Sequence, residues 1–77
     1  MPKLPIVKSK ILVKTLKNLG FIEHRQRSTS HLIMKNSDGR RASIPIHPGK
    51  DLPRGTLRGI LRDIEISPDE FIKALKK

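Results

Sequence analysis

One histidine in the sequence lies between two kinds of residue that could set up chemistry. His31 follows three small hydroxyl residues and precedes an apolar run in the string RSTSHLIM; the hydroxyl residues are Ser28, Thr29 and Ser30. Because an imidazole can take or give a proton near neutral pH, His31 is a candidate acid or base. A lone histidine is also commonly an incidental surface residue, and the residue type does not decide between the two.

The hydroxyl residues before His31 do not indicate a nucleophile. We find no Asp and second His placed to complete a serine-hydrolase triad, so we reject that class of enzyme. Ser28, Thr29 and Ser30 are more typical of a hairpin turn, with donation to a phosphate group as the functional alternative.

Two further histidines, His24 and His47, raise the question of whether the three histidines bind a metal ion. His47 is either a second acid–base group or a residue that shapes the turn HPG, and we favour the turn. His24 is expected to be exposed on the open face, and we assign it no function. Few acids accompany these histidines, and a chain of net charge +10 is a poor site for a divalent cation. We expect no metal and no other cofactor.

Positive charge is the dominant global feature. Lys and Arg number 17 against 7 for Asp and Glu, and the first 50 residues contain only two acids, Glu23 and Asp38. Such a surface attracts polyanions and releases counterions from phosphates, so nucleic acid is the expected partner, with an acidic protein as the alternative. The chain has no Tyr or Trp and only two Phe, so phosphate and sugar contacts are expected rather than base stacking.

Length and hydropathy indicate one small domain over residues 1–77. There is no cysteine, so neither a disulfide framework nor a thiolate zinc site is available. No apolar run approaches the roughly 20 residues of a membrane span, and MPKLPIVKSK lacks the apolar core of a signal peptide. We expect a soluble cytoplasmic protein with no membrane partner.

The segment after Ser9 is predicted to be a helix. Ser9 is expected to cap its first turn and Gly20 to close its last. The apolar face is formed by Leu12, Leu16 and Leu19, and the opposite face by Lys10, Lys14 and Lys17. These lysines, like Arg54, Arg58 and Arg62 further along the chain, are most simply solvated side chains. Functionally, both groups could hold an RNA backbone or receive an acidic protein.

The middle of the chain is predicted to form three antiparallel strands, Phe21–Gln26, Ser30–Asn36 and Arg40–Ile46. Gly39 in SDG can take the left-handed position that closes a three-residue hairpin. This loop places Leu32 opposite Ile44, Met34 opposite Ala42 and His31 opposite Pro45, with His47 diagonal to His31. The last strand should be an edge, because Pro45 has no N–H to donate. The face expected to stay open carries His31, Ile33, Lys35, Arg41 and Ser43.

The remaining sequence is predicted to form two helices. The first has an apolar stripe of Leu57, Ile60, Leu61 and Ile64, flanked by Arg54, Arg58 and Arg62. The second is a short helix in which Ser67 and Glu70 form a capping box with Pro68 at the first helical position. The fold class is therefore α+β: a three-stranded antiparallel sheet covered on one face by two helices, as in double-stranded-RNA-binding domains, plus a short C-terminal helix.

The strings LGFIEHRQR, STSHLIM and DGRRASIPIHPGKDLPRGTLRGILRDIEISPDEFI together resemble the HicA (YcfA-like) family of toxins. The resemblance runs from about Leu4 to Leu75 and implies the α-β-β-β-α fold. It also implies an RNase that cleaves mRNA and is held inactive by a HicB antitoxin.

The resemblance assigns the catalytic histidine of that family to His31, just after the start of the second strand. Ser28 stands where the family usually has glycine. Around His31 we expect RNA contacts from Arg27, Ser28, Thr29, Ser30, Lys35, Arg41 and His47. Arg27, Lys35 and Arg41 could also stabilise the phosphorane. The alternatives are a non-catalytic double-stranded-RNA-binding module and, less favoured, a DNA-binding regulator.

Overall fold

The computed structural model of the chain describes residues 4–28 and 30–76, and for residues 25–28 it describes the backbone alone. The elements in this part of the chain are α1 (Ser9–Asn18), β1 (Phe21–Ser28), β2 (His31–Asn36), β3 (Arg41–Pro45), α2 (Arg54–Asp63) and α3 (Pro68–Leu75). This order confirms the predicted α+β class. Every helix among the described residues is too short or too polar to span a membrane.

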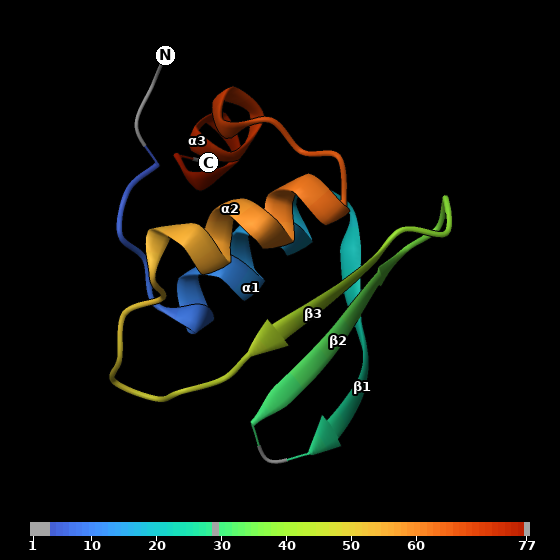
Figure 1. Cartoon of the computed structure of the whole chain (residues 1–77). Coiled ribbons are helices and arrows are strands. Elements are labelled where there is room, and N and C mark those ends of the chain that lie inside the picture. The colour runs from blue at the N-terminus through green and yellow to red at the C-terminus, as the bar shows by residue number, and fades with distance from the viewer. Residues whose placement is uncertain (1–3, 29, 77) are drawn as a thin grey trace.

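The molecule is built in layers, with the helices on one side of the sheet (Figure 1). α1 packs against β1 and β3, and α2 packs against β3. α3 packs against α1 on the side away from the sheet, where the side chain of Asn18 donates a hydrogen bond to the carbonyl of Ala74 at 3.2 Å. The core between these layers includes the fully buried Met34, Ile44 and Leu57. One face of the sheet is therefore covered and the other is open.

The predicted register of the β2–β3 hairpin is confirmed. The sheet order is β1-β2-β3, and Leu32 lies opposite Ile44 while His31 lies opposite Pro45. The N–H of Asn36 donates to the carbonyl of Arg40 at 2.9 Å, and the N–H of Gly39, whose φ is +98°, donates to the carbonyl of Asn36 at 3.0 Å, so that the three-residue loop is closed. β3 is an edge strand, as its proline requires.

The helix ends are mostly as predicted. Ser67 and Glu70 form both hydrogen bonds of the capping box, with Pro68 at the start of α3. Gly20, with a φ of +95°, follows the C-cap residue of α1 and donates its N–H to the carbonyl of Lys17. The expected cap by Ser9 is wrong: Ser9 is buried within the first turn, and the N-cap is Lys8.

The start of α1 is displaced by one residue because distant contacts hold Lys8 in extended backbone. Lys8 forms an isolated antiparallel bridge with Asp51, and Leu52 donates its N–H to the carbonyl of Val7 at 2.8 Å. Strand bounds also differ slightly from the prediction: β1 extends to Ser28 through two register shifts, while β2 and β3 are shorter.

Candidate functional site

His31 begins β2 at one end of the open sheet face. Its Cα pairs with Pro45 on the edge strand β3 and with Ser28 on β1, and its side chain is exposed. Because the next residue, Leu32, is buried against the helices, alternation along the strand turns His31 to the opposite side. The imidazole is therefore open to a large ligand that approaches the sheet.

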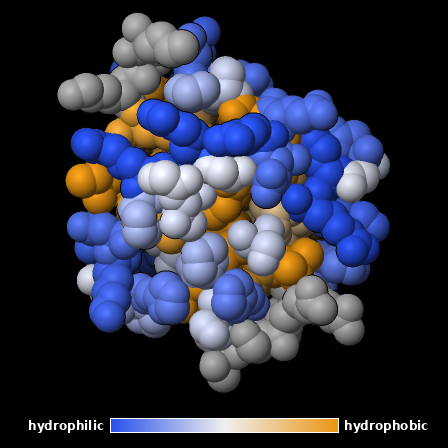
Figure 2. Space-filling model, in the orientation of Figure 1, coloured by the Kyte–Doolittle hydropathy of each residue, from blue (hydrophilic) through white to orange (hydrophobic). Residues whose placement is uncertain are grey.

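The open face has the composition expected from the alternation. Burial along β2 alternates, with buried residues separated by the more accessible His31, Ile33 and Lys35. On β3, Arg41 and Ser43 are exposed. Figure 2 shows that the surface of the molecule, in the orientation of Figure 1, is mostly hydrophilic, with smaller hydrophobic areas between the polar side chains. The open face of the sheet joins one histidine, His31, to the positive charges of Lys35 and Arg41.

Lys35 and Arg41 are neighbours of each other rather than of His31. They are Cα partners at the far end of the β2–β3 pair, next to the hairpin loop. Lys35 follows His31 by four positions along the strand, a spacing of about 13 Å. The two cations therefore extend the candidate surface along the strands, at a distance from the imidazole.

Ser30 and His47 lie close to His31 through the backbone. The carbonyl of Ser30 accepts a hydrogen bond from the N–H of Ile46 at 2.7 Å, which continues the pairing beyond β3. The carbonyl of His47 accepts from the N–H of Lys50 at 3.0 Å, and Gly49 has a φ of +79°. Pro and Gly at the two central positions match a type II turn. The favoured interpretation of HPG as a turn agrees with this geometry.

A cavity of about 270 Å³ adjoins this end of the sheet. Pro45, the partner of His31, lines it together with the exposed His47 and Lys50. The sequence does not single out Lys50, because the composition of a loop does not indicate where a single lysine will lie. The other lining residues are Ser9, Asp51, Leu52, Pro53 and Thr56.

Three of the predicted contact residues fall wholly or partly outside the described structure. Thr29 is not among the described residues, and Arg27 and Ser28 are described by their backbone alone. Both lie at the end of β1 beside a register shift, and Ser28 is the Cα partner of His31. Among the described residues, no group of three His, Asp or Glu side chains could hold a metal ion.

Acidic side chains near the candidate surface are few, and several of them are paired with cations. Asp38, in the hairpin loop, accepts hydrogen bonds from the backbone and side chain of Arg40. The backbone bond is the largest of the effects that lower the pKa of Asp38 below its usual 3.8. Exposed arginines also lie on α2, where the side chain of Arg54 donates a hydrogen bond to the carbonyl of Leu4 at 3.1 Å.

Fold and surface together define a small, basic α+β protein whose open sheet face presents a histidine. The chain belongs to the HicA toxin family of bacterial toxin–antitoxin systems, whose family model matches residues 9–66. This match confirms the resemblance drawn from the sequence and gives the chain the role of a toxin. No curated protein is significantly similar to the chain.

Proposed function

We propose that this toxin is an endoribonuclease that cleaves mRNA without a metal ion, using His31 as general acid or base. The observation that carries the proposal is the position of His31: exposed, at the start of β2, on the face opposite the helices. A net charge of +10 supports RNA as the ligand, because it favours binding to the phosphate backbone.

The chemistry needs one proton transfer at each of two oxygens. The ribose 2′-oxygen loses its proton and bonds to phosphorus, while the bond from phosphorus to the 5′-oxygen breaks and that oxygen gains a proton. An imidazole can accept the first proton or donate the second, and such catalysis typically contributes about 10²–10⁴-fold to the rate. Cationic side chains near the phosphorane would stabilise the charge that builds up on it.

The remaining predicted residues would hold the RNA. Ser30 and His47 lie near His31 and would contact the phosphate next to the cleaved bond. We assign Lys35 and Arg41 to phosphates further along the strand, because they lie about 13 Å away. Arg27, Ser28 and Thr29, in and beside the turn before His31, remain expected RNA contacts.

In this proposal the toxin acts in the cytoplasm, where mRNA is available, and its antitoxin is of the HicB type. The family match supports an antitoxin partner in general. The assignment of this antitoxin to the HicB type comes from the resemblance of the sequence to the HicA family.

The test is cleavage of a long RNA in EDTA by the purified chain, by His31→Ala and by His24→Ala. His24 is a matched control, since it is an exposed histidine on the neighbouring strand. We expect His31→Ala to bind RNA but to cleave it about 100-fold more slowly or worse, and His24→Ala to cleave like the unmodified chain.

Two outcomes would contradict the proposal in different ways. If the unmodified chain binds RNA and leaves it intact, the protein is the non-catalytic RNA-binding module that its fold and charge would also allow. If His31→Ala cleaves as fast as the unmodified chain, the nuclease is real but His31 is not its catalyst.

A further inference from the structure

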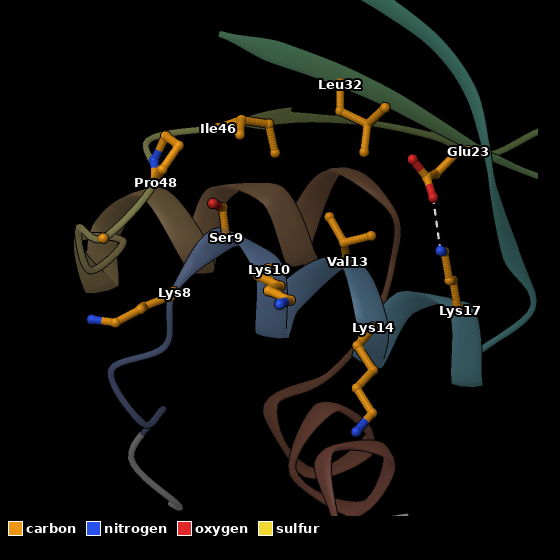
Figure 3. Close-up of a pocket in the computed structure, with 11 residues that line it drawn as sticks. Lys8, Ser9, Lys10, Val13, Lys14, Lys17, Glu23, Leu32, Ile46 and Pro48 are labelled. Atoms are coloured by element: carbon orange, nitrogen blue, oxygen red, sulfur yellow. Dashed lines mark ion pairs between the residues drawn. The ribbon is translucent and has the colours of Figure 1, made fainter.

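A groove of about 600 Å³ opens between α1 and the covered face of the sheet. Its apolar lining comes from Val13 on α1 and from Leu32 and Ile46 on the sheet side, and these side chains point toward one another (Figure 3). Val13 and Ile46 are only partly buried. The groove therefore offers apolar surface that the chain itself does not fill.

Lysines follow α1 along one side of this groove (Figure 3). The ammonium of Lys17 pairs with Glu23 at 2.7 Å. Lys10 and Lys14 form no ion pair with any described residue, and Lys14 points away from the sheet. The two lysines therefore place positive charge on the α1 side of the groove, apart from the apolar side chains of Val13, Leu32 and Ile46.

Lys10 and Lys14 do not stabilise the helix α1 at the positions where they lie. Lys10 lies in the first helical turn, where the helix dipole disfavours a cation, and that turn contains no acid. Lys14 follows four residues later, so the two like charges repel along one side of the helix. The same chain begins α3 with Asp69 and Glu70, as an isolated helix prefers. The charges on α1 are better explained by an acidic partner than by the stability of the toxin.

The combination of apolar lining and positive border fits a protein segment better than RNA. A phosphate backbone would use the lysines but would gain nothing from burying Val13 or Ile46. In addition, Leu32 lines the groove while the adjacent His31 lies on the other face of the sheet. RNA that crosses the open face to reach His31 would therefore not lie in the groove.

We propose that this groove binds an acidic segment of the cognate antitoxin. Apolar side chains of that segment enter between Val13 and Ile46, and its carboxylates pair with Lys10 and Lys14. The inference rests on the proposed function for the identity of the active face, and on the toxin family for the existence of an antitoxin.

The test compares two double charge reversals, Lys10→Glu with Lys14→Glu and Arg58→Glu with Arg62→Glu. Each pair lowers the formal net charge from +10 to +6, because every substitution removes one positive charge and adds one negative charge. The arginines are exposed on α2 and do not line the groove. Binding of the purified protein encoded by the gene adjacent to the toxin gene is measured by calorimetry and surface plasmon resonance, and RNA cleavage is measured separately.

We expect the lysine reversal to weaken antitoxin binding at least tenfold, mainly through slower association, and the arginine reversal to change it less than threefold. Both should affect RNA cleavage to the same extent. The lysine variant should also melt at a temperature no lower than the parent, because an acid at position 10 suits the helix dipole. If the lysine variant keeps its melting temperature, a loss of antitoxin binding cannot be attributed to misfolding.

Equal effects of both reversals on antitoxin binding would overturn the proposal, since only the overall charge would then matter. A lysine reversal that lowers RNA cleavage more than the arginine reversal does, and leaves antitoxin binding unchanged, would assign the groove to RNA. If the parent chain cleaves no RNA, the proposed nuclease function fails. The measurement of antitoxin binding still shows whether the groove binds the antitoxin.

Discussion

Arg40 is predicted to be the most important charged residue for the stability of this chain. Its guanidinium donates a hydrogen bond to the carbonyl of Ile64 at 2.7 Å, at the C-terminal end of α2, and another to Asp38 at 2.8 Å. It also lies 5.3 Å from the centre of the Phe21 ring. One side chain thus connects the hairpin loop, the first strand and the second helix.

The expected cost of Arg40→Ala follows from these contacts. A hydrogen bond from a charged donor contributes about 1.5–3 kcal/mol. The Phe21 ring is buried but the Arg40 side chain is partly exposed, and a cation–π contact of such a cation contributes about 0.5–1 kcal/mol. The pair with Asp38 adds little, because that carboxylate is exposed. The contacts share one partly exposed side chain and do not add fully, so we expect a loss of about 2–3 kcal/mol, or roughly 10–20 °C in melting temperature.

The measurement is urea unfolding of the parent, Arg40→Ala and Arg41→Ala. Arg41 is a matched control: it is the next residue, it carries the same charge, and its exposed side chain makes no hydrogen bond or ion pair with a described residue. We expect Arg41→Ala to cost less than about 0.5 kcal/mol. Equal losses from the two variants would refute the reasoning, because only the removal of a charge would then matter.

Further predictions concern single positions. Gly39→Ala should lower the free energy of unfolding by about 1–2 kcal/mol, because φ is +98° there and the new Cβ meets no atom within 4 Å, so backbone strain alone acts. Ser67→Ala should lower it by about 1 kcal/mol through loss of the capping box, with RNA cleavage unchanged. Lys35→Ala should reduce the slope of log binding constant against log salt by about 0.7–1 if that lysine contacts a phosphate. The hydrogen bond from the backbone of Arg40 lowers the pKa of Asp38, so its carboxylate stabilises the fold above pH 3.8 and this contribution is lost as the pH falls further. Urea unfolding from pH 5 to pH 2 should show the loss in the parent and less of it in Asp38→Asn.

The parts of the fold that the sequence predicted are those set by neighbouring residues. The loop SDG determines the hairpin length, and with it the pairing of Leu32 with Ile44, because a slip of one residue would turn every apolar side chain outward. Pro45 determines the edge strand for an equally local reason. The position of His31 on the open face followed from these two signals.

The parts that the sequence did not predict depend on residues far apart in the chain. Ser9 has the right chemistry for a cap, but Asp51, 43 residues after Lys8, holds the preceding backbone extended and moves the helix start. The register shifts in β1 were missed because that strand lacks a regular apolar alternation. The contact of Arg40 with Ile64 joins elements whose spacing only the packed structure defines.

Because the side chains of β2 alternate between the two faces of the sheet, the toxin has two separate surfaces at which different ligands can bind. His31 and Leu32 are adjacent in sequence, yet one belongs to the open face and the other to the groove beside α1. If His31 is the catalyst, as proposed, an antitoxin segment confined to the groove would leave the imidazole accessible. Inhibition would then require that the antitoxin also cover the open face near His31. An isolated acidic peptide that fits the groove should therefore bind the toxin without stopping RNA cleavage, whereas the whole antitoxin should do both.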